Sequence, residues 1–250
     1  MASSDEEKAK SKMKLADKFF DNGDYNTAEF LYTEALKLNP KQDFVYFRRG
    51  WIYHHFKNDD RAVFEYSKYL ELNPKDDMAF NNRGRAYYYL GQYEKAIEDF
   101  NKAVELNPNH KYAYRNRSEA YEKLGKYELA IDDRSRDIIL GNELAINYNA
   151  RGWCYINIHN YWRALSDCDK AIELAAEFAS AYDSRGWAYF GLKDYESAIE
   201  DFTAAIEIDS EFRTSYYGRG KCYEILGETE KAAADLKTAE DLGFTEKDLD

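Results

Sequence analysis

The chain has 250 residues, of which 44% are hydrophobic and 16% aromatic, and tyrosine alone occurs 23 times. Its 35 basic and 47 acidic residues give a formal net charge of −12, which argues against nucleic acid and anionic membranes as main partners. The sequence contains neither an apolar signal core near its start nor the run of about 20 apolar residues that a membrane-spanning helix needs. We therefore expect a cytoplasmic protein.

A 34-residue repeat organises nearly the whole chain. Position 20 of every repeat is alanine, and position 11 is tyrosine or phenylalanine. A fixed period of this length is typical of arrays in which neighbouring units stack to bury a continuous core. Residues 1–8 are expected to form a flexible N-terminal segment and residues 247–250 a C-terminal tail. The array between them, 9–246, consists of seven segments without insertion or deletion: 9–42, 43–76, 77–110, 111–144, 145–178, 179–212 and 213–246.

Each segment contains two groups of apolar residues at helical spacing. In 77–110 the first group includes Phe80 and Tyr87, and the second extends from Ala96 to Val104 after a short polar turn. The pattern predicts an all-α protein built from helix–turn–helix units. Glycine recurs at position 8 in five segments, although it costs up to about 1 kcal/mol inside a helix. We expect these glycines to face the alanine at position 20, where the two helices approach closely.

The spacing that recurs in the repeats of this chain resembles that of a known family. Aromatic residues at positions 4 and 24, glycine at 8, tyrosine at 11, alanine at 20 and 27 and proline at 32 resemble the tetratricopeptide repeat, most closely over Phe80–Pro108. The resemblance implies a right-handed α-solenoid of seven helix–turn–helix repeats. It also implies that the first helix of each pair lines a concave groove, through positions 2, 5, 9, 12 and 13, and that the second forms the convex face.

Arginine at position 7 and an acid at position 23 occur together in six repeats. The first repeat has Leu15 and Leu31 there instead, so the two positions change together within one chain. We expect arginine–carboxylate pairs between the two helices of each repeat, with anion binding by the arginines as the alternative. The six expected pairs are Arg49 with Glu65, Arg83 with Asp99, Arg117 with Asp133, Arg151 with Asp167, Arg185 with Asp201 and Arg219 with Asp235.

Aromatic residues are prominent at the groove positions, and three of the four tryptophans fall at position 9. Exposed tryptophan and tyrosine next to arginine are typical anchors of protein interfaces. The alternative is that these side chains pack against neighbouring first helices and only line the wall. The candidate partner-binding residues are Phe47, Trp51, His54, Arg85, Tyr88, Arg115, Trp153, Trp187 and Tyr217.

The fourth repeat departs from the pattern. Its groove positions are charged, with Arg115 and Glu119 among them, and Arg134 and Asp137 occupy positions that are apolar elsewhere. Because an unpaired charge is costly to bury, we expect Arg134 and Asp137 to pair with each other or with a neighbour. A hinge or a binding surface in two parts is a possible consequence.

The sequence offers no recognisable catalytic or metal-binding arrangement. It contains no nucleophile–base pair, phosphate-binding loop or metal-ligand spacing, so we expect no enzymatic activity, no cofactor and no metal. His110 and His159 fall in turns and are expected to be solvated. The three cysteines, Cys154, Cys168 and Cys222, take the place of small or apolar residues and are expected to be reduced core residues.

These features favour a non-enzymatic protein–protein interaction scaffold or adaptor. It would be monomeric and would bind a peptide or a partner helix in the concave groove, with neither nucleic acid nor membrane as partner. The alternative is a structural assembly component that associates through its acidic convex face or with itself. A chaperone cofactor is less favoured, because the carboxylate clamp of such family members needs asparagine at position 9, which no repeat has.

Overall fold

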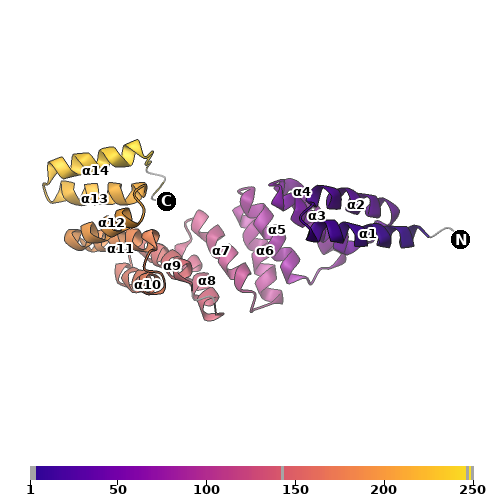
Figure 1. Ribbon diagram of the computed structural model, residues 1–250. Helices are drawn as coiled ribbons and strands as arrows, with labels where there is room; N and C mark the ends of the chain where they lie inside the picture. The colour runs from indigo at the N-terminus through magenta and orange to yellow at the C-terminus, as the bar shows by residue number, and fades with distance from the viewer. Residues whose placement is uncertain (1–3, 142–143, 246–247, 249–250) are drawn as a thin grey trace. The chain divides into compact units, whose positions relative to one another are not determined.

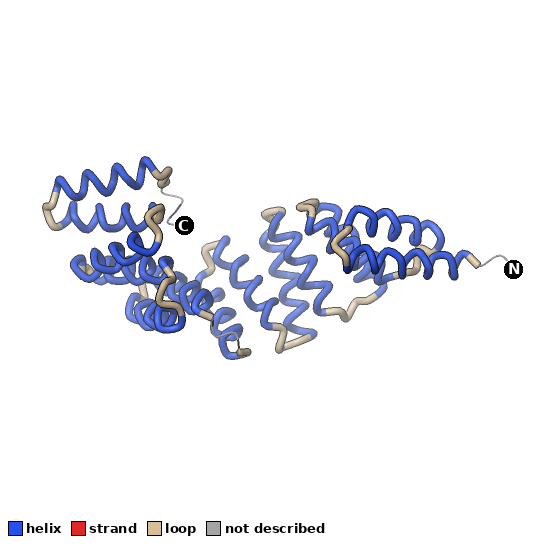
Figure 2. Tube along the Cα trace, viewed as in Figure 1, coloured by secondary structure: helices blue, strands red, loops and turns tan. Residues whose placement is uncertain are grey.

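The computed structural model describes residues 4–141, 144–245 and 248, and the regular structure in these ranges is helical (Figures 1 and 2). This confirms the all-α fold class. None of the helices is both long and apolar enough to cross a bilayer, within the ranges described. The helices are α1 (Asp5–Asp21), α2 (Tyr25–Leu38), α3 (Asp43–His55), α4 (Asp59–Leu72), α5 (Asp77–Tyr89), α6 (Tyr93–Leu106), α7 (Lys111–Lys123), α8 (Tyr127–Ile139), α9 (Ala145–Asn157), α10 (Tyr161–Leu174), α11 (Ala179–Leu192), α12 (Tyr195–Ile208), α13 (Arg213–Ile225) and α14 (Thr229–Asp241).

The chain forms two compact units, Met1–Leu124 with α1–α7 and Gly125–Asp250 with α8–α14. In the first unit α1 packs on α2, α3 on α4 and α5 on α6, and each second helix also contacts the first helix of the next repeat. The second unit repeats this arrangement with α9 on α10, α11 on α12 and α13 on α14. First helices also touch one another, α3 with α5 and α5 with α7 in the first unit. Consecutive helix pairs therefore stack as the repeat predicts.

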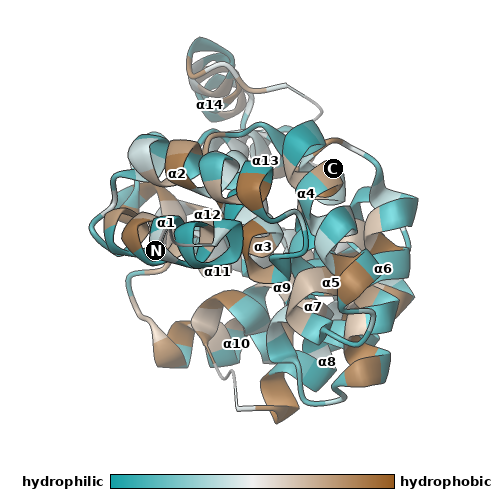
Figure 3. Ribbon diagram, turned by 90° about the vertical axis from the view of Figure 1, so that its right-hand side faces the viewer, coloured by the Kyte–Doolittle hydropathy of each residue, from teal (hydrophilic) through white to brown (hydrophobic). Residues whose placement is uncertain are grey.

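The glycines at position 8 make room first of all for the side chain at position 24. A Cβ added to Gly84 would lie 2.7 Å from Phe100 Cε1, and one added to Gly186 would lie 2.8 Å from Phe202 Cε1. Both rings are fully buried. At Gly84 and Gly186 the nearest group is therefore the ring at position 24 and not the expected alanine. At Gly152 the carbonyl oxygen of the expected Ala164 lies 3.5 Å from the added Cβ, behind Cys168 Sγ at 3.0 Å. Figure 3 shows hydrophobic and hydrophilic residues interspersed along the helices.

The turn inside each helix pair has one left-handed residue, at position 15. Four repeats have glycine there, for example Gly91 with φ 71°, but the other three use Lys57, His159 and Lys193 with φ between 57° and 64°. A side chain is strained in this region of φ. The turn geometry is therefore set by the repeat as a whole and holds even where the residue does not favour it.

The N-terminal boundary differs from expectation. Helix α1 begins at Asp5, and Ser4 caps it: Ser4 Oγ accepts from the Glu7 N–H at 3.2 Å, and Glu7 Oε2 accepts from the Ser4 N–H at 3.0 Å. Residues 5–8, expected to be flexible, are thus the first turn of α1. At the other end, Asp248 accepts from Arg213 Nη2 at 2.7 Å. Residues 1–3 of the expected N-terminal segment, 142–143 of the fourth repeat, and 246–247 and 249–250 at the C-terminus lie outside the described residues.

Candidate functional site

The arginines at position 7 are engaged in ion pairs within their own repeats. Arg83 donates from Nε and Nη2 to the two carboxylate oxygens of Asp99, both at 2.7 Å. Arg151–Asp167, Arg185–Asp201 and Arg219–Asp235 have the same two-pronged geometry, and Arg49 Nη2 lies 3.0 Å from Glu65 Oε1. The expected clasp is confirmed for these five pairs. The sixth, Arg117 with Asp133, is divided between the two units. These arginines are therefore not an anion-binding row.

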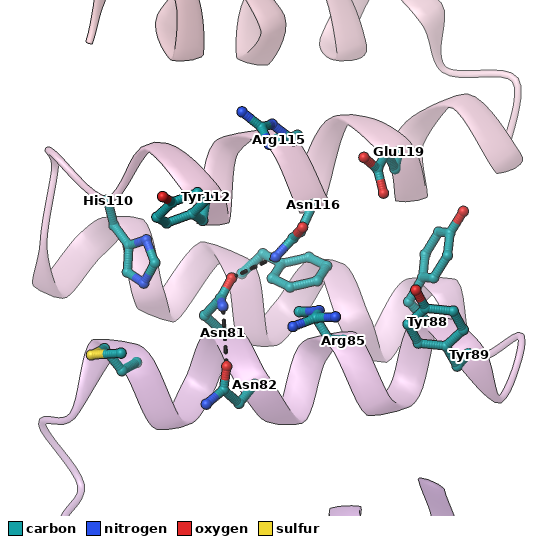
Figure 4. Close-up of a pocket in the computed structure, with 12 residues that line it drawn as sticks. Asn81, Asn82, Arg85, Tyr88, Tyr89, His110, Tyr112, Arg115, Asn116 and Glu119 are labelled. Carbon is teal, nitrogen blue, oxygen red and sulfur yellow. Dashed lines mark hydrogen bonds between the residues drawn. The ribbon is translucent and has the colours of Figure 1, made fainter. Parts of the chain in front are cut away.

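A pocket of about 500 Å³ lies between α5 and α7 of the first unit (Figure 4). A second pocket, of about 600 Å³, lies between α3 and α5. Arg85 and Tyr89 line both pockets, so the two are parts of one surface, which we call the α3–α5–α7 groove. The first pocket is lined by Met78, Asn81, Asn82, Arg85, Tyr88, Tyr89, Phe100, His110, Tyr112, Arg115, Asn116 and Glu119, and the second by Trp51, His54, His55, Lys57, Asp59, Arg85 and Tyr89.

Side-chain amides form a short chain across the first pocket. Asn116 on α7 donates from Nδ2 to Asn81 Oδ1 on α5 at 2.8 Å, and Asn81 Nδ2 donates to Asn82 Oδ1 at 3.4 Å (Figure 4). Asn81 is buried, whereas Asn82 and Asn116 are half-buried at the surface of the pocket. The chain fixes the spacing of α5 and α7 at the floor of the groove.

His110 closes one end of the first pocket as the N-cap of α7. Its Nδ1 accepts from the Ala113 N–H at 3.3 Å, so the proton of the neutral ring is on Nε2. Burial lowers the pKa of His110, with Asp77 opposing the shift, and this keeps the ring neutral at pH 7. Within the described residues Nε2 is buried without a hydrogen-bond partner, since Asp77 Oδ2 is 4.0 Å away. The expectation that His110 is solvated was therefore wrong, because the cap draws the ring under α7.

The centre of the groove combines one cation with exposed rings. Arg85 is half-buried and makes no hydrogen bond or ion pair to any residue that the structure describes. Tyr89 is 62% exposed, while burial raises the pKa of the neighbouring Tyr88 to about 12. His54 donates from Nδ1 to Asp59 Oδ1 at 2.5 Å, which occupies that carboxylate. The centre of the groove thus presents an exposed ring beside a cation that has no partner among the described residues.

Five of the nine candidate residues line the α3–α5–α7 groove: Trp51, His54, Arg85, Tyr88 and Arg115. Phe47 instead packs against core rings, with centroids 5.7 Å from Tyr66 and 5.2 Å from Tyr69. Trp51 also contributes to the wall, since its ring lies 4.9 Å from Phe20 and stacks on His55 at 5.2 Å.

Two of the three candidates of the second unit pack against other rings. Trp187 lies edge-on to Phe202, with centroids 5.3 Å apart, and Tyr217 stacks on Phe244 at 4.2 Å. Trp153 is half-buried on α9. For Trp187 and Tyr217 the packing alternative describes the contacts that they make. A role in binding stays a prediction for all three residues.

Some groove residues were not among the candidates. Tyr89 occupies position 13, one of the groove positions, and its 62% exposure singles it out. Asn82 and Asn116 are at position 6 and His110 is at position 34, outside the five groove positions used. The asparagines could have been identified from the sequence, because each is a polar residue next to a groove position. The capping role of His110 had no signal in the repeat.

The remaining expectations concern buried polar and sulfur-containing side chains. Arg134 and Asp137 of α8 are 5% and 0% exposed, and neither is without a partner. Cys154, Cys168 and Cys222 are buried and form no disulfide within the described residues, which confirms that they are core residues. Among the described residues, no group of three histidine, cysteine or acidic side chains is arranged to hold a metal ion.

Comparison with known proteins points to one family. Sequence profiles described as "Tetratricopeptide repeat" match residues 13–77, 78–110, 100–132, 179–212 and 214–242, which together span more than half of the chain. No curated protein matches the chain significantly.

Solved structures resemble the chain over most of its length. A tetratricopeptide repeat protein from Parabacteroides merdae is 23% identical with a TM-score of 0.73, covering 97% of this chain and 96% of that one. The C-terminal part of a repeat-containing protein from Cytophaga hutchinsonii is 21% identical with a TM-score of 0.76, covering 95% and 97%. YrrB, described as a TPR protein with an unusual peptide-binding site, is 23% identical with a TM-score of 0.58, covering 71% and 92%. At these identities the likeness shows the fold.

Proposed function

The chain belongs to the tetratricopeptide repeat family, and we propose that it is a non-enzymatic scaffold that binds a segment of a partner protein in the α3–α5–α7 groove. Proteins with this repeat generally act as interaction modules rather than enzymes. The proposal includes a monomeric, cytoplasmic protein whose partner is a peptide or a helix, neither nucleic acid nor membrane. Sedimentation of the purified chain checks the monomeric state.

The observation that carries this proposal is the composition of the groove. An exposed ring, Tyr89, lies beside an arginine without a partner, Arg85, where two pockets meet. Aromatic residues and arginine are the side chains most often found at the energetic centres of protein interfaces. The resemblance to YrrB, whose description records a peptide-binding site in the same type of fold, supports a peptide segment as the partner class.

The convex side is a second candidate surface, because α2 and α4 carry exposed phenylalanines. Phe30 is 60% exposed and Phe64 is 59% exposed, and both occupy position 22 of their repeats. Large apolar side chains repeated on one face can mark a protein interface. Assembly through this face is therefore the competing function.

The two surfaces are separated by a matched pair of substitutions. Tyr89→Ala and Phe64→Ala each remove one ring of nearly equal exposure, 62% and 59%, so neither is expected to unfold the protein. Wild type and both variants are used as affinity baits in cell extract, and the captured proteins are quantified by mass spectrometry. We expect specific partners to be depleted with Tyr89→Ala and retained with Phe64→Ala. Partners that depend on Phe64 and are indifferent to Tyr89 would contradict groove binding and support the convex face.

A further inference from the structure

We infer that the segment bound in the α3–α5–α7 groove carries an aspartate or glutamate whose side-chain carboxylate binds Arg85, next to an aromatic or aliphatic residue that contacts Tyr89. This inference rests on the proposed function and adds the chemistry of the partner. It concerns one place, the centre of the groove, where the two pockets meet at Arg85 and Tyr89.

Arg85 differs from the arginines around it. Arg49 and Arg83 hold carboxylates at 3.0 Å and 2.7 Å, whereas Arg85 has no hydrogen bond or ion pair to the described part of the chain. It is nevertheless half-buried between the two pockets. Its guanidinium therefore lies at the surface of both pockets without a counter-charge from the described residues. A carboxylate is the group that its planar donors fit best.

The acids near Arg85 are otherwise occupied. Asp59, in the second pocket, accepts from His54 Nδ1 at 2.5 Å. Glu119 lies on α7 towards Tyr88, at the opposite end of the first pocket from His110 (Figure 4), and it already interacts with another residue. Arg115 and Lys57 add two more cations to the lining. The groove is thus a local exception in a chain of net charge −12, and it complements an acidic segment.

The buried Nε2–H of His110 is a second polar group without a partner beside this pocket. The side chain of His110 is only 9% exposed, lines the first pocket and leaves this donor without an acceptor. A buried donor without a partner is costly unless something binds it. Because Nε2 is closed to solvent, a carbonyl oxygen of the bound segment would reach it only after the His110 ring turns towards the pocket.

The position of Arg85 indicates that the carboxylate it binds belongs to an internal side chain of the bound segment and not to the C-terminus of that segment. Because Arg85 lines both pockets, a segment that fills them passes over it and continues on either side. The exposed ring of Tyr89 lines the same two pockets, and the stacked rings of Trp51 and His55 form the wall of the second. An apolar residue beside the acid would contact these rings, while the acid would meet Arg85.

Selection from a random peptide library tests the inference on the full-length chain. The library displays 12-residue peptides fused at their C-termini, so no peptide offers a free terminal carboxylate. Peptides that bind wild type but not Tyr89→Ala are collected and sequenced. We expect most of them to contain an aspartate or glutamate adjacent to an aromatic or aliphatic residue.

The best peptide is then synthesised with an amidated C-terminus and titrated by calorimetry. We expect Arg85→Gln to weaken binding about tenfold or more, since a charged hydrogen-bonded pair is lost. Arg163→Gln, an exposed arginine of the second unit, makes the same change of charge and should leave affinity unchanged. A peptide whose acidic residue is replaced by lysine should not bind wild type, but it should bind the Arg85→Glu variant.

The outcomes separate the inference from the function beneath it. Tyr89-dependent peptides without an acid, or affinity that is indifferent to Arg85→Gln, would overturn the inference and leave groove binding intact. A selection that yields no Tyr89-dependent peptide would contradict the proposed function and the inference together.

Discussion

At the scale of single residues, the buried carboxylates depend on the arginine opposite them. Asp99 is 5% exposed, and burial raises its pKa even though Arg83 opposes the shift. The two hydrogen bonds at 2.7 Å keep the carboxylate satisfied in a setting that disfavours its charge. The first repeat, with Leu15 and Leu31 at the same positions, shows that the fold also accepts an apolar pair.

The first prediction follows from that comparison. We expect Arg83→Ala to lower the free energy of unfolding by about 2–4 kcal/mol, because it leaves the buried Asp99 without its partner. Replacing both residues by leucine, as in the first repeat, should recover most of the loss. Chemical denaturation of the three proteins measures both effects. If the double variant were as unstable as Arg83→Ala, the ion pair would have a role that an apolar pair cannot fill.

The second prediction concerns Asp183, which accepts from Ser215 Oγ at 2.6 Å. Burial raises the pKa of Asp183 to about 7, and hydrogen bonds from Ser215 and Thr214 offset part of the shift. Because the folded state holds the proton more tightly than the unfolded state, this group stabilises the fold at low pH, and that contribution is lost as pH rises through 7.

Asp183→Asn imitates the protonated form at every pH. We therefore expect its free energy of unfolding, relative to wild type, to increase by at least about 1 kcal/mol between pH 5 and pH 8. Glu65→Gln examines the same effect at a second carboxyl group. Burial also raises the pKa of Glu65 to about 7, although the Arg49 guanidinium is close to it. Denaturation curves at the two pH values provide the measurement. If the difference in free energy of unfolding between Asp183→Asn and wild type were the same at pH 5 and pH 8, Asp183 would be ionised in the folded protein across this range.

At the scale of helices, the pairing within a repeat is set by the contact between positions 8 and 24. A Cβ at Gly84 would lie 2.7 Å from the fully buried Phe100 ring, whereas one at Gly152 would lie 3.0 Å from Cys168 Sγ. The fifth repeat thus fills the same space with a smaller side chain. A single repeat pattern therefore gives helix pairs that tolerate change to different degrees.

The third prediction compares these two glycines. We expect Gly84→Ala to lower the free energy of unfolding by about 1–3 kcal/mol through overpacking. Gly152→Ala should be nearly neutral, because the helix propensity gained by alanine, up to about 1 kcal/mol, offsets a milder contact. Thermal or chemical denaturation distinguishes the two variants. Equal effects would mean that the ring at position 24 is not what requires the glycine.

The repeat made the helices easier to predict than the groove. First helices begin at Asp43, Asp77 and Lys111, and the same 34-residue interval separates those that follow, because every repeat uses the same turn and core positions. The contact of Gly84 with Phe100 was missed, since sequence spacing places position 8 near the second helix but does not say which side chain fills the gap. His110 was missed because its cap depends on the local backbone at the start of α7.

The groove residues were predicted only in part, for a related reason. The family pattern identifies which positions face the groove, and it correctly placed Arg85 and Tyr88 there. It does not show how far a large ring bends back onto its neighbours, as Trp187 does on Phe202. The exposure of the groove side chains and the atoms that they contact cannot be predicted from the sequence, because they depend on the rotamers of residues from three helices.

At the scale of the whole molecule, the chain consists of two compact units whose boundary falls between Leu124 and Gly125. This point lies in the turn of the fourth repeat, the repeat whose sequence departs most from the pattern, with Arg134 and Asp137 at buried positions. The α3–α5–α7 groove belongs to the first unit, while Trp187 and Tyr217 of the second unit pack against other rings. The proposed binding surface therefore lies in the first unit.

Mapping of a bound partner segment by NMR tests this account most directly. A peptide selected on the chain is titrated into the full-length protein labelled with ¹⁵N, and amide shifts are followed residue by residue. We expect the largest changes on α3, α5 and α7, centred on Arg85 and Tyr89. Changes concentrated on α2, α4 and α6, around the exposed Phe30 and Phe64, would contradict groove binding.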